Sequence, residues 1–376
     1  MKQTFTVEQK SLLSILSSMQ PICSKRTTLD ATTSILFNVG SRELILKGTD
    51  LEISLQAMYP LSQSSLTEQC TFLVNGKRLF DVIKELDGTI VFTFENNQLS
   101  LDAHGISLSL NIKDAQEFPP FPERIENLMQ MESKFLLTLL DKVGFLIPQN
   151  NGNPALNGLL LEIDATSFTM TTTDGHCLAQ IKTNNYTLEK SQSWLLPRRA
   201  ILELRKVLEE SKDEQVFLGT CGNQLVFSGE MFNFFTKLLA SPFPEYKGIL
   251  EKTGFIPATV DRGSLVKTLR RSTCLLSGQF IATSFDFNPQ NIDVVMNNKE
   301  VGKLEEKLAL QDFKGEDLSM RFYAPYLLSG LNAFSDETIT FYLKNASKPI
   351  IFESTTVDKY QLTYLVMPVS PTTSQV

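Results

Sequence analysis

Two short stretches, Thr49-Asp50-Leu51-Glu52 and Thr173-Asp174-Gly175-His176, follow similar alternating segments and decide the fold. The first comes after ELILKG and the second after FTMTT, and the Thr-Asp pair recurs at an offset of 124, from position 50 to position 174. Two further matches have nearly the same spacing, because NQL begins at 97 and again at 223, and Phe-Pro-Glu begins at 121 and again at 243. Matches in one order and with almost one period indicate tandem domains.

A third copy is fainter but keeps the order. Asn298 follows IDVVM and Pro368 follows TYLVM, each 124 positions after Asp174 and Pro244 respectively. The 376 residues divide into three domains of ordinary size. We therefore place the domains at residues 1–127, 128–252 and 253–376.

Each third combines helical and extended patterns. An apolar run with helical spacing comes first, and a second helix is predicted midway, at 76–86, 197–208 and 324–334. Alternating runs such as TIVFTF and ISLSLNI have the period of two that half-buried strands require. The expected fold class is α+β, with two helices on antiparallel sheet in each domain.

Composition excludes several protein classes. Hydrophobic residues make up 42% and charged residues 20%, which is typical of a folded globular protein. No apolar run approaches the length of a membrane helix, and the opening MKQTFTVEQK is unlike a signal peptide, so we expect a cytoplasmic protein. The five cysteines stand singly, which favours neither a disulfide framework nor a zinc site. We expect no metal and no cofactor.

Positive charge collects on the predicted helices although the net charge is −7. The basic residues are Lys25, Arg26, Lys77, Arg78, Lys84, Lys134, Lys142, Arg198, Arg199, Arg205, Lys206, Arg262, Lys267, Arg270 and Arg271. If all helices faced one way, they would form a basic wall that contacts phosphates and not base edges. The alternative is that each is an ordinary solvated helix face.

The combination of motifs resembles the bacterial DNA polymerase III beta subunit, the sliding clamp. The resemblance rests on the two Thr-Asp stretches, on Leu156-Asn157-Gly158, on Phe243-Pro244-Glu245-Tyr246 and on Tyr364-Leu365-Val366-Met367-Pro368, and it runs from Phe5 to Pro368. It implies a head-to-tail homodimer that encircles duplex DNA without sequence preference and has no catalytic chemistry. The predicted DNA contacts are Lys25, Arg26, Lys77, Arg78, Gln149, Arg198 and Arg199.

The resemblance also implies a pocket that accepts short linear motifs from the replicative polymerase, the clamp loader, other polymerases and repair proteins. A few apolar anchors in a groove would supply the affinity. Its residues would be Leu156, Thr173, Gly175, His176, Leu178, Pro244, Ile249, Tyr326, Leu365, Val366, Met367 and Pro368. The alternative for most of these residues is plain hydrophobic core.

The matching dimer positions are Leu108 and Leu110 on an edge strand, and Leu275 and Leu276 after the first helix of the third domain. An apolar edge strand is a liability unless it is paired, although these leucines could equally be internal core. The chain departs from the family at Cys177 and Gly248, where arginines are common, so the pocket rim has less positive charge. It also continues to Val376, beyond the usual end.

Two other functions remain as alternatives. In an enzyme, Asp174 and His176 would form an acid/base pair with Cys177 as nucleophile, but no further orienting group is in evidence. We prefer a turn in which Asp174 caps the backbone and Gly175 takes the conformation that the turn needs. No phosphate-binding G-x-x-x-x-G-K motif supports an ATPase. The second alternative is a scaffold that binds proteins only, in which the basic helix faces are dispensable.

Overall fold

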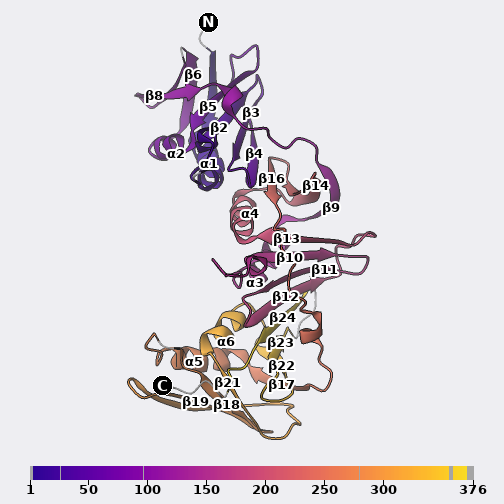
Figure 1. The fold of residues 1–376 in the computed structure, drawn as a ribbon. Helices are drawn as coiled ribbons and strands as arrows, with labels where there is room; N and C mark the ends of the chain where they lie inside the picture. The colour runs from indigo at the N-terminus through magenta and orange to yellow at the C-terminus, as the bar shows by residue number, and fades with distance from the viewer. Residues whose placement is uncertain (1–2, 26, 96, 279, 355–358, 371–376) are drawn as a thin grey trace. The chain divides into compact units, whose positions relative to one another are not determined.

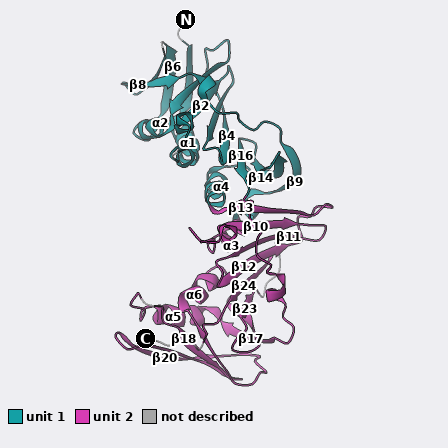
Figure 2. Ribbon diagram, in the orientation of Figure 1, with its two compact units in different colours: residues 1–137, 199–238 teal, residues 138–198, 239–376 magenta. Residues whose placement is uncertain are grey.

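The computed structural model describes residues 3–25, 27–95, 97–278, 280–354 and 359–370. Residue contacts divide the chain into two compact units, which Figure 2 shows in two colours. Unit 1 takes residues 1–137 and 199–238, and unit 2 takes residues 138–198 and 239–376. Each unit is described by itself below.

The helices arise where the sequence places apolar residues at helical spacing (Figure 1). They are α1 (Gln9–Cys23), α2 (Gly76–Lys84), α3 (Ser133–Gly144), α4 (Arg198–Glu210), α5 (Arg262–Thr273) and α6 (Ala324–Leu331). In α1 the apolar face of Leu12, Leu16 and Met19 is fully buried. The side chain of Asn75 caps α2 by accepting from the backbone N–H of Arg78 at 3.0 Å, which confirms the predicted start of that helix.

The strands in the described residues form six sets of four, and neighbouring strands within each set are antiparallel. The sets of the first third are β1 (Gln3–Glu8), β6 (Thr89–Glu95), β7 (Gln98–Ala103), β8 (Ile106–Lys113), and β5 (Cys70–Asn75), β2 (Ser34–Val39), β3 (Glu43–Thr49), β4 (Ile53–Pro60). Those of the second are β9 (Glu126–Glu132), β14 (Gln215–Cys221), β15 (Gln224–Ser228), β16 (Phe232–Lys237), and β13 (Gln192–Pro197), β10 (Gly158–Ile163), β11 (Phe168–Thr173), β12 (Cys177–Thr183). Those of the third are β17 (Ile256–Asp261), β22 (Thr338–Leu343), β23 (Ile350–Glu353), β24 (Gln361–Val366), and β21 (Leu318–Phe322), β18 (Thr283–Phe287), β19 (Asn291–Asn298), β20 (Gly302–Ala309).

Corresponding strands join neighbouring sets in each unit. In unit 1, β4 pairs with β16, with Ser54 opposite Phe235. This pairing and the short contact between β5 and β8 join twelve described strands in one sheet. In unit 2, β12 pairs with β24 in the same way, with Leu178 opposite Leu365, and unites eight strands. The chain therefore builds one kind of sheet junction twice.

Strands β20 and β8 each have one side with little or no pairing in the described residues. Among the described residues, β20 pairs only with β19, and β8 pairs with β7 and touches β5 only at its last two residues. The three repeats and the antiparallel sheets confirm the predicted α+β fold class. No helix in the described part of the chain is long and apolar enough to cross a membrane.

Candidate partner site and nucleic-acid interface

The turn between β11 and β12 has a capped backbone. Oδ1 of Asp174 accepts the N–H groups of His176 at 2.8 Å and of Cys177 at 2.7 Å. Oγ1 of Thr173 accepts the N–H of Gly175 at 3.2 Å, and Gly175 has a φ of 94°, which glycine adopts without strain. The turn therefore presents His176 outward at a fixed position.

An apolar row crosses the sheet of unit 2 beside this turn. Strand register places Leu195 opposite Leu160, Leu178 opposite Leu365, and Leu365 opposite Ile351. These five residues and Tyr246 form one buried cluster, against which Leu239, Phe243, Leu250, Phe255, Tyr342 and Met367 pack while partly exposed. We call this set the apolar row. It lies on the sheet face that the connecting segment 239–255 covers.

Aromatic rings border the turn. The ring of His176 stacks on that of Tyr326, with centroids 5.6 Å apart and planes 17° apart. The hydroxyl of Tyr364 donates to the carbonyl of Tyr326 at 2.8 Å, and the carbonyl of His176 accepts the N–H of Met367 at 2.9 Å. The first turn of α6, strand β24 and the turn after β11 thus hold one another.

The structure brings most predicted partner-site residues together. Leu178, Leu365 and Met367 belong to the apolar row, and Leu156 is buried beside Gly175. Val366 is fully buried opposite Cys177, and Pro368 is half-buried at the end of β24. Pro244 and Ile249 are exposed on the covering segment, on either side of Tyr246.

Sequence reasoning found Leu178, Leu365 and Met367 of the apolar row and missed its other members. Leu160, Leu195 and Ile351 lie in continuous apolar runs, where nothing in the sequence tells which residues share a face with Leu178. Tyr246 was visible as the end of the Phe-Pro-Glu-Tyr motif. Its hydroxyl donates to Glu162, and burial together with that carboxylate raises its pKa.

The geometry contradicts the enzyme alternative. The side chain of Cys177 is 1% exposed, and burial followed by the nearby Asp174 raises the pKa of its thiol to about 12. A thiol of this kind is not a nucleophile at neutral pH. Asp174 is used by the turn, and the described residues contain no group of three potential metal ligands.

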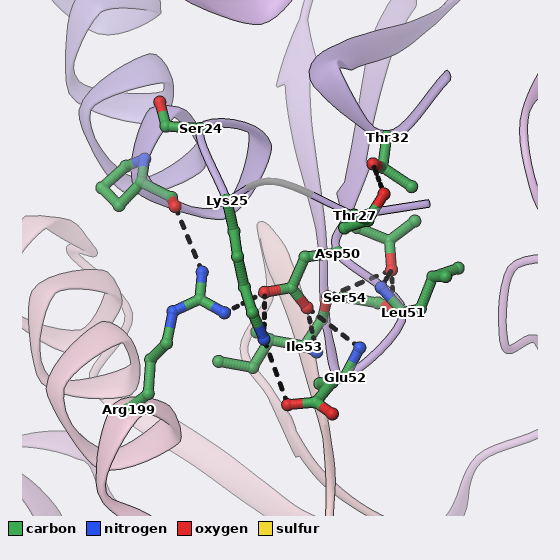
Figure 3. A network of polar contacts seen from close by, with 12 residues as sticks. Ser24, Lys25, Thr27, Thr32, Asp50, Leu51, Glu52, Ile53, Ser54 and Arg199 are labelled. Atoms are coloured by element: carbon green, nitrogen blue, oxygen red, sulfur yellow. Dashed lines mark hydrogen bonds and ion pairs between the residues drawn. The ribbon is translucent and has the colours of Figure 1, made fainter. Parts of the chain in front are cut away.

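The corresponding turn in unit 1 has the same backbone frame and different surroundings. Oδ1 of Asp50 accepts the N–H groups of Glu52 at 2.9 Å and Ile53 at 2.8 Å, and Leu51, at the position of Gly175, has a φ of 74°. Figure 3 shows Arg199 reaching from α4 to this carboxylate, and Lys25 lying between Asp50 and Glu52. The turn is therefore part of an ion-pair network.

The Asp50 carboxylate is charged within this network. Its side chain is fully buried, and burial alone would raise its pKa. The hydrogen bond from Arg199 and the N–H groups of Ile53 and Glu52 outweigh burial, so the pKa lies below its usual value. A second guanidinium nitrogen of Arg199 donates to the carbonyl of Pro21 near the end of α1 at 3.1 Å.

The predicted DNA contacts differ in how free their side chains are. Lys77, Arg78 and Gln149 are exposed. Arg198 is half-buried and donates to the carbonyl of Ile147 at 3.1 Å, and Arg199 and Lys25 belong to the Asp50 network. Arg26 lies outside the described residues.

Two other helix cations bind the end of α6 and the segment after it, where Arg262 also donates to the carbonyl of Leu331 at 3.5 Å. Lys142 donates to the carbonyl of Ala333 and to Oγ of Ser335, and Arg262 donates to the carbonyl of Asp336 at 2.6 Å. Carbonyls at a helix carboxyl end attract cations. Part of the positive charge on the helices therefore fastens helix ends.

The predicted dimer residues lie on β8 and in the segment after α5. Leu108 on β8 is 38% exposed and its neighbour Ile106 is 47% exposed, while Leu110 is half-buried. Leu275 and Leu276 are half-buried after α5, where the side-chain amide of Asn298 donates to the carbonyl of Leu275 at 2.7 Å. Exposed apolar side chains on an edge strand favour pairing with another strand.

Models of the three domains of the DNA polymerase III beta subunit match this chain in order. The N-terminal domain matches residues 3–122, the central domain 130–245 and the C-terminal domain 250–370. The chain belongs to the DNA polymerase III beta subunit family. Its function is therefore that of a sliding clamp, a processivity subunit without catalytic chemistry of its own.

Individual relatives of this family resemble the chain over nearly its whole length. The beta sliding clamp of Pseudomonas putida is 26% identical over 368 residues, covering 97% of this chain and 99% of the relative. A crystal structure of the sliding clamp from Pseudomonas aeruginosa has a TM-score of 0.88 at 25% identity, covering 98% of this chain and all of that one. The Bacillus subtilis clamp, at 20% identity and a TM-score of 0.88, has the same fold.

Proposed function

We propose that two copies of this chain join head to tail in a ring around duplex DNA, and that the apolar row with the His176 turn receives the partners of the ring. The domains of the ring are residues 1–127, 128–252 and 253–376. The ring works in the cytoplasm, on DNA of any sequence.

The repeated sheet junction supports the ring. Strands β4 and β12 each pair with the strand that corresponds to β8 in the next domain. In the described residues, β20 pairs only with β19, and β8 leaves most of one side unpaired because it meets β5 only at its last two residues. Pairing β20 with β8 of a second copy completes the series. Two such head-to-tail contacts close a ring.

The internal pairings also predict the register of this contact. Across their hairpins, Thr49 pairs with Ser54 in the first domain and Thr173 pairs with Leu178 in the second. In the third domain the pair at this position is Asn297 with Lys303, so Lys303 corresponds to Ser54 and Leu178. In the two sheet junctions, Ser54 lies opposite Phe235, and Leu178 lies opposite Leu365. On β8, the residue that corresponds to Phe235 and Leu365 is Ser109. Lys303 should therefore face Ser109 of the partner subunit, and Leu304 should face Leu108 of the partner subunit.

The DNA surface is proposed to consist of exposed cations and polar groups on the helices and near their ends. Lys77, Arg78 and Gln149 are available to phosphates, whereas Lys25, Arg198 and Arg199 contribute mainly through the field of their charges. Contacts of this kind carry no sequence information and weaken with salt. Both properties suit a ring that moves along DNA.

The partner site takes short linear motifs with apolar anchors. The single observation that carries this proposal is the apolar row, whose outer members Phe243, Leu250 and Met367 are only partly buried at a sheet face. The neighbouring His176 and Tyr326 supply a ring surface and polar edges. Partners would be the catalytic subunit of the replicative polymerase, the clamp loader, other polymerases and repair proteins.

Retention on DNA tests the ring. The chain, loaded by a clamp loader, should stay on closed circular DNA and leave it after linearisation, because a ring slides off free ends. A scaffold that binds only proteins would be retained on neither form. Equal retention on circular and linear DNA would contradict the ring and indicate an ordinary DNA-binding protein.

A further inference from the structure

Asn298, at the end of β19, has a buried side-chain amide that is hydrogen-bonded on both sides. Its Oδ1 accepts the N–H of Glu300 at 3.0 Å, and its Nδ2 donates to the carbonyl of Leu275 at 2.7 Å and to Oγ of Ser277 at 3.2 Å. The side chain is 4% exposed. The reverse orientation of the amide would place two oxygens against each other, so the donor must face the segment after α5.

The repeat shows why this position carries an amide. Asn298 stands 124 positions after Asp174, as Asp174 does after Asp50, and both carboxylates accept N–H groups of their own turns. Lys25, the second residue after α1, meets the Asp50 carboxylate at 3.7 Å. Leu275, the second residue after α5, presents a backbone carbonyl instead, which only a donor can bind. Asparagine keeps the acceptor that the turn needs and adds this donor.

Asn298 connects the two parts of the proposed dimer surface. On one side, its turn leads into β20, which pairs only with β19 in the described residues. On the other side lie Leu275 and Leu276, both half-buried. A second connection between α5 and β20 is the ion pair of Arg271 with Glu306, but Arg271 is exposed, and exposed ion pairs contribute little. The buried amide, with its three hydrogen bonds, is therefore the stronger connection.

We propose that Asn298 is a positioning residue for ring closure. Its amide sets where the segment after α5 lies relative to β20, so that both parts meet the partner subunit together. This role rests on the proposed head-to-tail ring. Surfaces that are arranged before association lose less conformational freedom on binding. Without the amide donor, Leu275 and Leu276 have to be ordered during association, which weakens the dimer.

The dissociation constant of the dimer tests this role, measured on the full chain by sedimentation at a series of concentrations. Asn298→Asp keeps the acceptor for the turn and removes the donor, so it should raise the dissociation constant about tenfold. Asn297→Asp is the charge control, because it adds the same charge one position earlier, where the side chain is exposed. It should change the dissociation constant by about twofold or less.

Thr172→Val is the matched control for stability. The hydroxyl of Thr172 is buried and donates to the carbonyl of Val143 near the end of α3 at 2.8 Å, so this variant loses a similar hydrogen bond in the second domain. Thr172→Val and Asn298→Asp should both lower the midpoint of urea unfolding, but only Asn298→Asp should weaken the dimer. Equal dissociation constants for these two variants would show that Asn298 serves folding alone and would overturn the proposal.

A double variant tests whether Asn298 acts through the segment after α5. Leu276→Ala should itself weaken the dimer about tenfold, and Asn298→Asp in the same chain should add about threefold or less, because the two residues act as a unit. Effects that multiply in full would contradict this route. A solitary unmodified chain would overturn the ring itself, whereas a tight dimer that Asn298→Asp leaves unchanged would overturn only the role of Asn298.

Discussion

The turns after β3 and after β11 have the same backbone hydrogen bonds, but charged side chains surround the first and apolar and aromatic side chains surround the second. In both turns, the aspartate side chain accepts the N–H groups of the second and third residues after it. The hydroxyl of the preceding threonine accepts the N–H of the first residue after the aspartate. The positions that differ are Leu51 against Gly175, Glu52 against His176, and Ser54 against Leu178. The repeat conserves the backbone and varies what stands on it.

The first turn links helices α1 and α4 in unit 1. Arg199 from α4 links the Asp50 carboxylate to the carbonyl of Pro21 in α1, and Thr27 and Thr32 add a short hydroxyl contact at 2.6 Å nearby (Figure 3). The second turn lies beside the apolar and aromatic groups that we propose accept other molecules. We call the contacts of Arg199 with Asp50 and with the carbonyl of Pro21 the strut. The same turn thus holds the strut in one place and borders the proposed docking site in the other.

The strut gives the largest expected effect. Arg199→Ala leaves a buried carboxylate without its main partner, which should lower the stability of unit 1 by about 3 kcal/mol. Urea titration with hydrogen exchange in segment 9–23 measures it. The control is Lys77→Ala, an exposed position near the start of α2, with an expected change of about 0.5 kcal/mol or less. A loss of stability for Arg199→Ala no larger than that of the control would show that the strut does not stabilise unit 1.

Acid should weaken the strut selectively. The pKa of Asp50 in the folded chain is lower than the ordinary value of 3.8, so the contribution of this carboxylate to stability is complete at neutral pH and is lost as the pH falls below about 4 and through the folded pKa. Asp50→Asn should cost about 2 kcal/mol at pH 7, and the cost should shrink as the pH falls through the folded pKa. Parallel stability curves for the two proteins would show that the carboxylate is not the cause.

Exchanging one side chain between the turns tests the docking site. His176→Glu introduces the residue that stands at this position in the first turn and removes the ring that stacks on Tyr326. The affinity for a polymerase-derived peptide should fall about tenfold. Glu52→His, the reverse exchange, should leave the affinity unchanged. Calorimetric titration distinguishes them, and an unaffected His176→Glu variant would place the docking site elsewhere.

The smallest effect concerns DNA. Lys77→Ala with Arg78→Ala should reduce the slope of log affinity against log salt by about two, because two free cations are removed. Arg271→Ala should leave the slope nearly unchanged, since this guanidinium is already held by Glu306. A fluorescence titration at several salt concentrations compares the two variants with the unmodified chain. Equal slopes for all three proteins would show that α2 is not part of the DNA surface.

The sequence predicted local features well and distant partnerships poorly. The cap of Asp174, the glycine conformation at 175 and the start of α2 follow from residue chemistry within a few positions, and each was confirmed. The pairing of Arg199 with Asp50 joins residues far apart in the chain, so its basic side chain was indistinguishable from a phosphate contact. The apolar row depends on strand register, which continuous apolar runs do not reveal.

Cysteine cross-linking tests most directly the claim that the third junction forms between two chains. In a protein with Ser109→Cys and Lys303→Cys, mild oxidation should yield a covalent dimer and no larger species, because both contacts close within one ring. Either variant alone should stay uncross-linked at these positions. A product that remains monomeric, or a ladder of higher multimers, would contradict the closed head-to-tail ring.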